Sequence, residues 1–190
     1  MTLPTIDNRD KLIRSVQVFG FLPFFSGPIP GYSIDDAVPP EVWATHQGLG
    51  PWMWRDEIAH EGSCIYGKFF MGKTGYVSKA WFAHLANYRR DGYDFDARYD
   101  DGLAKFSDKQ LFEMIDRMAP VVSKDLREAG GYAYNGRWKK VEGKKGFDTS
   151  LTRLQELCYV TTTDFVFKIG KSGSRHGIGA AQYSTPEKWF

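Results

Sequence analysis

The segment from Thr149 to Ser184 reads as one helix followed by a long hairpin, and this order constrains the fold more than any other feature of the chain. Thr149 and Ser150 form a helix cap signal, after which apolar residues recur at helical spacing at Leu151, Leu154, Leu157 and Cys158. Residues 159–169 are rich in aromatic and β-branched side chains, which favour a strand. A glycine-rich, basic segment at 170–177 predicts a hairpin tip, and residues 178–184 continue as the second strand.

A helix followed by a basic hairpin is the order at the nucleic-acid-binding end of winged helices, where the helix enters a groove and the hairpin tip contacts the backbone. Two earlier helices are predicted in the same half. The first begins at a capping box formed by Ser107 and Gln110 and runs to Met118, and the second begins at Pro120 and ends at Gly130-Gly131. The second half therefore has the order helix, helix, basic loop, helix, hairpin.

The first half also has helices followed by a hairpin, without a repeat of the residues. Helices are predicted over 7–19 and from Pro51 to near Gly62. A hairpin follows over 63–77 with its turn at 72–75, and Ser78 caps a helix over 79–88. We therefore expect an α+β, mainly helical fold of two tandem winged-helix-like units, residues 1–104 and residues 105–190.

The charge of the chain divides unevenly between these halves. Residues 1–104 carry 10 Lys and Arg against 13 Asp and Glu, whereas residues 105–190 carry 15 against 10. The positive excess is densest at 137–145 and recurs around the hairpin tip. Such a field favours phosphate backbones, whereas the alternative is a solvated loop that keeps the protein soluble. The residues expected to contact double-stranded DNA are Arg137, Lys139, Lys140, Lys144, Lys145, Arg153, Lys171 and Arg175.

The junction between the halves, residues 87–102, contains five Asp, three Arg and four aromatic residues. No helical or strand period orders them. One interpretation is a site loop in which Asp94 and Asp96 are the candidate catalytic carboxylates, arginines bind phosphate and tyrosine stacks on a base. The alternative is an interdomain clasp in which the arginines pair with the aspartates. The Asp94-Phe95-Asp96 spacing is a weak metal signal, because it lacks the glycine and distal glutamate of a calcium loop.

Aromatic and basic residues elsewhere predict a groove between the two halves. Trp52 and Arg55 lie one helical turn apart, so a guanidinium can stack on an indole; the alternative is that the tryptophans belong to the core. Lys68 lies among apolar strand residues, where it reaches into a cleft or protects a strand edge. The groove residues are Trp52, Trp54, Arg55, Tyr66, Lys68, Arg89, Arg90 and Tyr93.

Several classes of protein are not indicated by this sequence. No stretch is long and apolar enough to cross a membrane and Met1 to Asp10 lacks the character of a signal peptide, so we expect a cytoplasmic protein without a membrane partner. Cys64 and Cys158 have no Cys or His neighbour at metal-ligand spacing, which predicts reduced, buried thiols. We expect no cofactor and no metal, and oligomeric state is not predicted.

Five motifs together resemble one family. They are Pro51-Trp52-x-Trp54-Arg55, Tyr66-Gly67-Lys68-Phe69-Phe70, Tyr76-Val77-Ser78, the run from Asn87 to Asp96, and Tyr183-Ser184-Thr185-Pro186-Glu187. These motifs resemble the AlkZ-related bacterial proteins, which look like distant relatives of the AlkZ or YcaQ winged-helix DNA glycosylases. The resemblance implies a tandem winged-helix architecture that binds duplex DNA, and the more distant one implies excision of alkylated bases or unhooking of crosslinks.

The sequence departs from the glycosylase pattern at the residues that carry that activity. Those enzymes place a Gln-x-Gln or Gln-x-Asp pair after the first helix, where this chain has Pro23-Phe24-Phe25. Neither Pro23 nor Phe25 can orient water or stabilise a sugar cation. Two functions therefore remain: a DNA-binding protein that lacks the glutamine pair, or a domain that binds a protein or small ligand in its aromatic groove.

Overall fold

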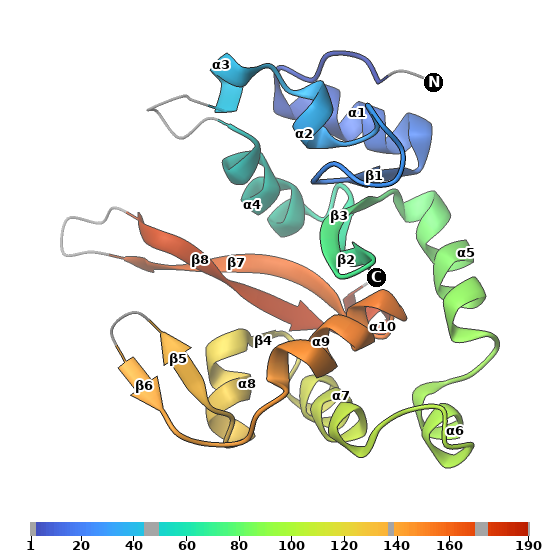
Figure 1. Ribbon diagram of the computed structural model, residues 1–190, viewed down its shortest axis with the longest axis vertical. Helices are drawn as coiled ribbons and strands as arrows, with labels where there is room; N and C mark the ends of the chain where they lie inside the picture. The colour runs from blue at the N-terminus through green and yellow to red at the C-terminus, as the bar shows by residue number, and fades with distance from the viewer. Residues whose placement is uncertain (1–2, 44–49, 137–138, 170–174, 190) are drawn as a thin grey trace.

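The computed structural model describes residues 3–43, 50–136, 139–169 and 175–189. The fold mixes helices with one six-stranded antiparallel sheet and a separate two-stranded hairpin. Figure 1 shows the four described helices within residues 9–61 above the long hairpin of β7 (Thr161–Ile169) and β8 (Arg175–Ser184), and the two helices within residues 106–129 below it. The predicted α+β class is therefore confirmed.

The first half contains six helices and three strands in the described part of the chain. They are α1 (Arg9–Phe19), β1 (Phe21–Pro23), α2 (Ile34–Ala37), α3 (Pro40–Trp43), α4 (Pro51–Glu61), β2 (Ile65–Phe70), β3 (Lys73–Val77), α5 (Lys79–Arg90) and α6 (Phe95–Asp100). Local signals explain the boundaries of the longer helices. Asn8 caps α1 by accepting a hydrogen bond from the Lys11 amide, and Gly62 ends α4 in the left-handed conformation.

The second half contributes the remaining elements of the described chain. They are α7 (Phe106–Met118), β4 (Val121–Val122), α8 (Ser123–Ala129), β5 (Tyr134–Gly136), β6 (Lys139–Val141), α9 (Phe147–Glu156), β7 (Thr161–Ile169), β8 (Arg175–Ser184) and α10 (Pro186–Trp189). The predicted basic loop between α8 and α9 thus includes a hairpin, β5–β6. Residues 170–174 of the predicted hairpin tip lie outside the described residues, whereas residues 175–177 of that tip belong to β8, which begins before the predicted start at residue 178.

Four predicted boundaries differ from the structure. The turn between β2 and β3 is Met71-Gly72, both with positive φ, so the predicted turn residues 73–75 belong to β3. The junction predicted to lack helical order contains α6. Pro120 precedes the short strand β4 rather than starting a helix, and α9 begins at Phe147, before the predicted cap at Thr149-Ser150. Ser150 is buried inside α9, where its hydroxyl donates to the Ser107 hydroxyl.

The six-stranded sheet is shared by both halves of the chain. Its strand order is β1-β3-β2-β7-β8-β4, so strands of the first half meet those of the second where Tyr66 of β2 pairs with Thr162 of β7. The Thr161 hydroxyl also donates to the Tyr66 carbonyl. The tandem winged-helix arrangement is not confirmed, because one continuous sheet joins the halves, and the boundary at residue 104 stays a prediction.

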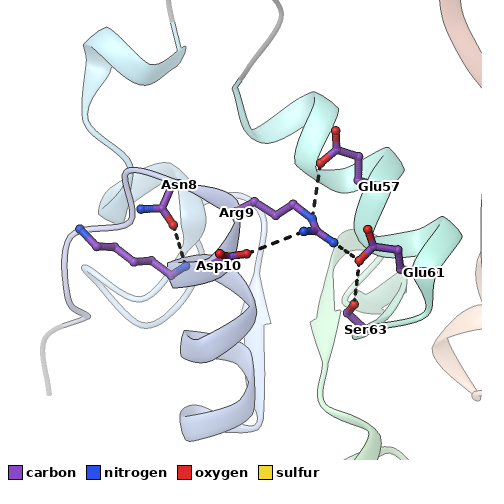
Figure 2. Close-up of polar contacts among 7 residues, drawn as sticks. Asn8, Arg9, Asp10, Glu57, Glu61 and Ser63 are labelled. Atoms are coloured by element: carbon purple, nitrogen blue, oxygen red, sulfur yellow. Dashed lines mark hydrogen bonds and ion pairs between the residues drawn. The ribbon is translucent and has the colours of Figure 1, made fainter.

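An ion-pair network fastens α1 to α4. The guanidinium of Arg9 lies between the carboxylates of Glu57 and Glu61, and Ser63 donates a hydrogen bond to Glu61 (Figure 2). The helix α4 in turn packs on β7, and Phe165 of β7 belongs to the same apolar core cluster as Ile58 of α4. This packing fixes the first half against the sheet.

Candidate nucleic-acid interface

A basic cleft opens beside the start of α9. It has a volume of about 770 Å³ and is lined by Arg127, Ala133, Val141, Glu142, Gly143, Lys144, Lys145, Gly146, Phe147, Asp148 and Thr149. Three of the lining residues are cations and two are carboxylates, so the cleft carries a net positive charge. We call it the β6–α9 cleft after the two elements that flank it.

Backbone hydrogen bonds hold Lys144 in a fixed place at this cleft. The Lys144 amide donates to the Gly131 carbonyl at 2.9 Å, and the Ala133 amide donates to the Lys144 carbonyl at 2.8 Å. The side chains of Lys144 and Lys145 are exposed. Among the described residues, no carboxylate lies within ion-pair distance of either ammonium group. Both charges are therefore open to an anionic ligand.

Arg127, unlike the two lysines, makes several contacts within the protein. Its guanidinium pairs with Asp148 at 2.6 Å, donates to the Ala133 carbonyl at 3.1 Å and lies 4.0 Å from the centre of the Phe147 ring. These contacts tie α8 to the first turn of α9. Gly146, with φ 93°, sits at the N-cap of α9 and supplies no side chain to cap the helix. The first residues of α9 line the cleft, and no side chain caps this helix at Gly146.

The other residues predicted to contact DNA have different surroundings. Arg153 is not a free cation, because it forms a two-point ion pair with the buried carboxylate of Asp108 on α7. Lys139 and Lys140 lie on β6, paired through the backbone with Gly136 and Asn135. Arg175 begins β8 opposite Ile169. Arg137 and Lys171 lie outside the described residues.

Two basic hairpins flank the same side of the molecule. Figure 1 shows β5–β6 and β7–β8 projecting toward one side, with the predicted Lys139, Lys140 and Arg175 positions on their strands. Lys168, near the end of β7, is exposed. The backbone therefore carries these predicted positions on two hairpins that lie toward the same side of the molecule.

The predicted groove residues of α4 and β2 lie in and around the apolar core of the first half. Trp52 is 46% exposed and stacks on the buried Phe24 ring at 4.7 Å, whereas Trp54 and Tyr66 are buried. The Arg55 guanidinium pairs with Asp56, lies 3.8 Å from the Phe165 ring centre and 5.4 Å from that of Trp52. The predicted stacking of Arg55 on Trp52 is thus present, next to a core cluster to which Phe165 of the second half also belongs.

The remaining groove residues hold the two halves together. The Arg89 guanidinium donates to the carbonyls of Glu156 and Phe69, both at 2.5 Å. Arg90 donates to the Cys158 carbonyl at 2.5 Å, pairs with Glu187 and lies over the Tyr159 ring. Lys68 donates to the Thr152 hydroxyl at 3.1 Å. These contacts form a clasp, but the arginines bind carbonyls and Glu187 rather than the predicted aspartates of the junction.

The two candidate catalytic carboxylates lie at the start of α6. Asp94 caps this helix by accepting a hydrogen bond from the Ala97 amide at 2.8 Å, and Asp96 lies 3.4 Å from the Lys109 ammonium group. Both residues are exposed. Tyr93 donates its hydroxyl proton to Asp101 at 2.9 Å. Tyr93, Asp94 and Asp96 lie in one short segment at the start of α6, and Figure 1 shows α6 far from α4, the helix that carries Trp52.

One side-chain contact was not predicted from the sequence. His60 near the end of α4 and Asp164 of β7 approach to 2.9 Å between Nδ1 and Oδ2. Their separation of 104 residues leaves no local signal. This contact is a further link between α4 and the sheet.

Neither a membrane-spanning helix nor a metal-binding cluster is found in the described part of the chain. None of its helices has the length and apolar character that crossing a bilayer requires. Within the same residues, no three His, Cys, Asp or Glu side chains gather in a way that would hold a metal ion.

Comparison with known proteins places the chain in a family. The family model described as AlkZ related matches residues 6–190. The chain belongs to the AlkZ-related family. No curated protein matches this AlkZ-related chain. A solved structure, a conserved hypothetical protein from Chlorobium tepidum, is 16% identical over 95% of this chain and 94% of that chain, with a TM-score of 0.27. That score is too low to bear on the fold of the AlkZ-related chain.

Proposed function

We propose that this protein binds double-stranded DNA through the face formed by the β6–α9 cleft and the two basic hairpins. The observation that carries the proposal is the pair of exposed lysines, Lys144 and Lys145, held beside the start of α9 without a carboxylate partner among the described residues. Phosphate oxygens are the ligands that lysine side chains and backbone amides bind in DNA complexes.

The family and the element order support the same function. AlkZ-related proteins resemble winged-helix DNA glycosylases, and here α9 is followed by the β7–β8 hairpin in the order typical of a winged helix. In this proposal the hairpin contacts the DNA backbone beside the cleft. The face of α9 that carries Arg153 packs on α7, so α9 contributes its first turn rather than Arg153.

The proposed activity is binding without base excision. The residues that replace the glutamine pair of the glycosylases are Pro23, Phe24 and Phe25, and Phe24 is fully buried beneath Trp52. None of the three carries a group that orients water. Asp94 and Asp96 are the remaining candidate carboxylates. We expect no base release from an alkylated or crosslinked duplex, and release by the wild type that the D94N/D96N variant loses would instead assign these two residues to catalysis.

A salt series of duplex binding tests the proposal. Wild-type affinity is expected to fall steeply with salt, because each phosphate contact contributes about 0.9 to the slope of log affinity against log salt. The variant K144E/K145E is expected to bind weakly at low salt and to lose about two units of that slope.

A matched control separates local contacts from total charge. The variant K11E/R14E makes the same change of net charge at exposed positions on α1 and is expected to retain most of the wild-type affinity. Absence of wild-type binding at low salt, or equal losses in both variants, would contradict the proposal.

A further inference from the structure

We propose that the β6–α9 cleft accepts an unpaired nucleotide of the bound DNA, in addition to the contacts that the face makes with the duplex backbone. This inference rests on the proposed function, since it names the part of the DNA that enters the site. Three properties of the cleft carry it: its size, its mixed lining and its rigidity.

The cleft is larger than a phosphate contact requires. Its volume of about 770 Å³ lies within the range of roughly 300–1,000 Å³ that is typical of sites for small molecules. The phosphates of an intact duplex lie on the outside of a wide rod, so exposed lysines reach them without any hollow. Only a nucleotide that leaves the helical stack, or an unpaired one at a chain end, can project into such a space.

The lining combines charged and apolar groups, as a nucleotide does. Lys144 and Lys145 provide two exposed cations for the phosphate, and Arg127 adds a third that Asp148 orients. Ala133, Val141 and Phe147 supply apolar surface for a sugar and base, with Val141 38% exposed. A site that binds only phosphate does not require this apolar surface.

The cleft is preformed. Hydrogen bonds between 131–133 and Lys144 hold the loop, and Gly143 lies so close that an added Cβ would be 2.5 Å from the Gly131 carbonyl oxygen. The Arg127–Asp148 pair fixes the opposite wall. A ligand therefore binds without ordering the loop first, which lowers the entropic cost of binding.

A pair of DNA probes with equal numbers of phosphates tests the inference. A duplex with a single-stranded overhang is expected to bind about tenfold more tightly than a blunt duplex of the same nucleotide count, a ratio that corresponds to about 1.4 kcal/mol. Thr149 lines the cleft and is exposed, so T149W fills the space without changing charge. T149W is expected to bind both probes with equal affinity, so that the preference of the wild type for the overhang is lost. The control T149V should keep the tenfold preference.

The outcomes separate this inference from the proposed function. Equal wild-type affinities for the two probes, or a preference that survives in T149W, would overturn the inference and leave duplex binding intact. If the blunt duplex fails to bind, the proposed function fails, and titration with a 5′-phosphorylated thymidine dinucleotide then decides. Binding of this dinucleotide that is lost in both T149W and K144E/K145E would support a nucleotide site in the cleft, and absence of binding would overturn it.

Discussion

The guanidinium of Arg153 on α9 forms a two-point ion pair with the carboxylate of Asp108 on α7, with nitrogen–oxygen distances of 2.8 and 2.5 Å. Asp108 is 5% exposed, and the Ser150 and Ser107 hydroxyls complete the cluster. Because a buried carboxylate without its partner is costly, this pair sets how α9 docks on α7. A residue predicted as a DNA contact thus belongs to the internal framework of the protein.

Replacing Asp108 by an uncharged residue should lower the free energy of unfolding at pH values above the pKa of this carboxyl group. Burial acts to raise the pKa of Asp108, but hydrogen bonds from Arg153 and Ser150 outweigh it and hold the pKa below its ordinary value of 3.8. A lowered pKa contributes stability above the ordinary value, and that stability is lost as pH falls through the lowered pKa. We expect D108N to lower the free energy of unfolding by about 2 kcal/mol near neutral pH. Urea unfolding should show this difference shrinking below about pH 4, and a difference independent of pH would contradict it.

The two phenylalanines that follow Pro23 should differ sharply in their contribution to stability. Phe24 is fully buried and stacks on Trp52, whereas Phe25 is 37% exposed. We expect F24A to cost about 3–5 kcal/mol and F25A less than about 1 kcal/mol. Urea unfolding of both variants measures the difference, and similar losses would mean that Phe25 is as deeply packed as Phe24.

A methyl group at Gly143 should disturb the cleft. Its Cβ would lie 2.5 Å from the Gly131 carbonyl oxygen and 2.9 Å from the Ala133 nitrogen, so the loop that carries Lys144 must move. We expect G143A to weaken DNA binding about tenfold. The control is G27A, because an added Cβ at Gly27 meets nothing within 4 Å. Equal affinities for G143A and G27A would show that the fixed position of the loop is unimportant.

Both thiols should resist modification in the folded protein. Burial raises the pKa of Cys64 to about 12 and that of Cys158 to about 11, so the reactive thiolate is scarce at about pH 8. A thiol-specific chromophoric reagent is expected to react slowly with the native protein and rapidly once urea has unfolded it. Fast labelling of either cysteine under native conditions would be inconsistent with its buried position.

The Asp94 side chain should contribute to stability through its hydrogen bond rather than through its charge. Asp94 caps α6 through the Ala97 amide, a role that asparagine also fills. We expect D94A to lower the free energy of unfolding by about 1 kcal/mol and D94N to change it little. Thermal unfolding compares the two, and equal losses would point to an electrostatic role for the carboxylate.

Local signals in the sequence predicted much of the secondary structure. Gly62 and Ser78 stand at the helix ends where the sequence predicted them, because caps and left-handed termini depend on neighbouring residues alone. The β5–β6 hairpin was missed because its charged residues lack the alternation of apolar side chains that indicates a strand. The short helix α6 was not predicted, because about one and a half turns are too few for apolar residues to show a helical period.

The candidate site was predictable only in part. The concentration of positive charge directed attention to Lys144 and Lys145, since charge can be counted along the chain, and the structure places both lysines at the β6–α9 cleft. The partner of Arg153 was not predictable, because Asp108 lies 45 residues away and meets it only when α7 and α9 pack. The cleft itself depends on the same packing, through the Arg127–Asp148 pair.

The pairing of Tyr66 with Thr162 sets the order in which this protein can assemble during synthesis. When β2 and β3 leave the ribosome, the edge of β2 has no neighbour until nearly a hundred further residues have been made. Until then the nascent chain presents an unpaired strand edge, the type of surface that chaperones shield and that other chains can join. The slow step in folding is therefore expected to be the arrival of β7, and the N-terminal half should depend on the C-terminal half for its final stability.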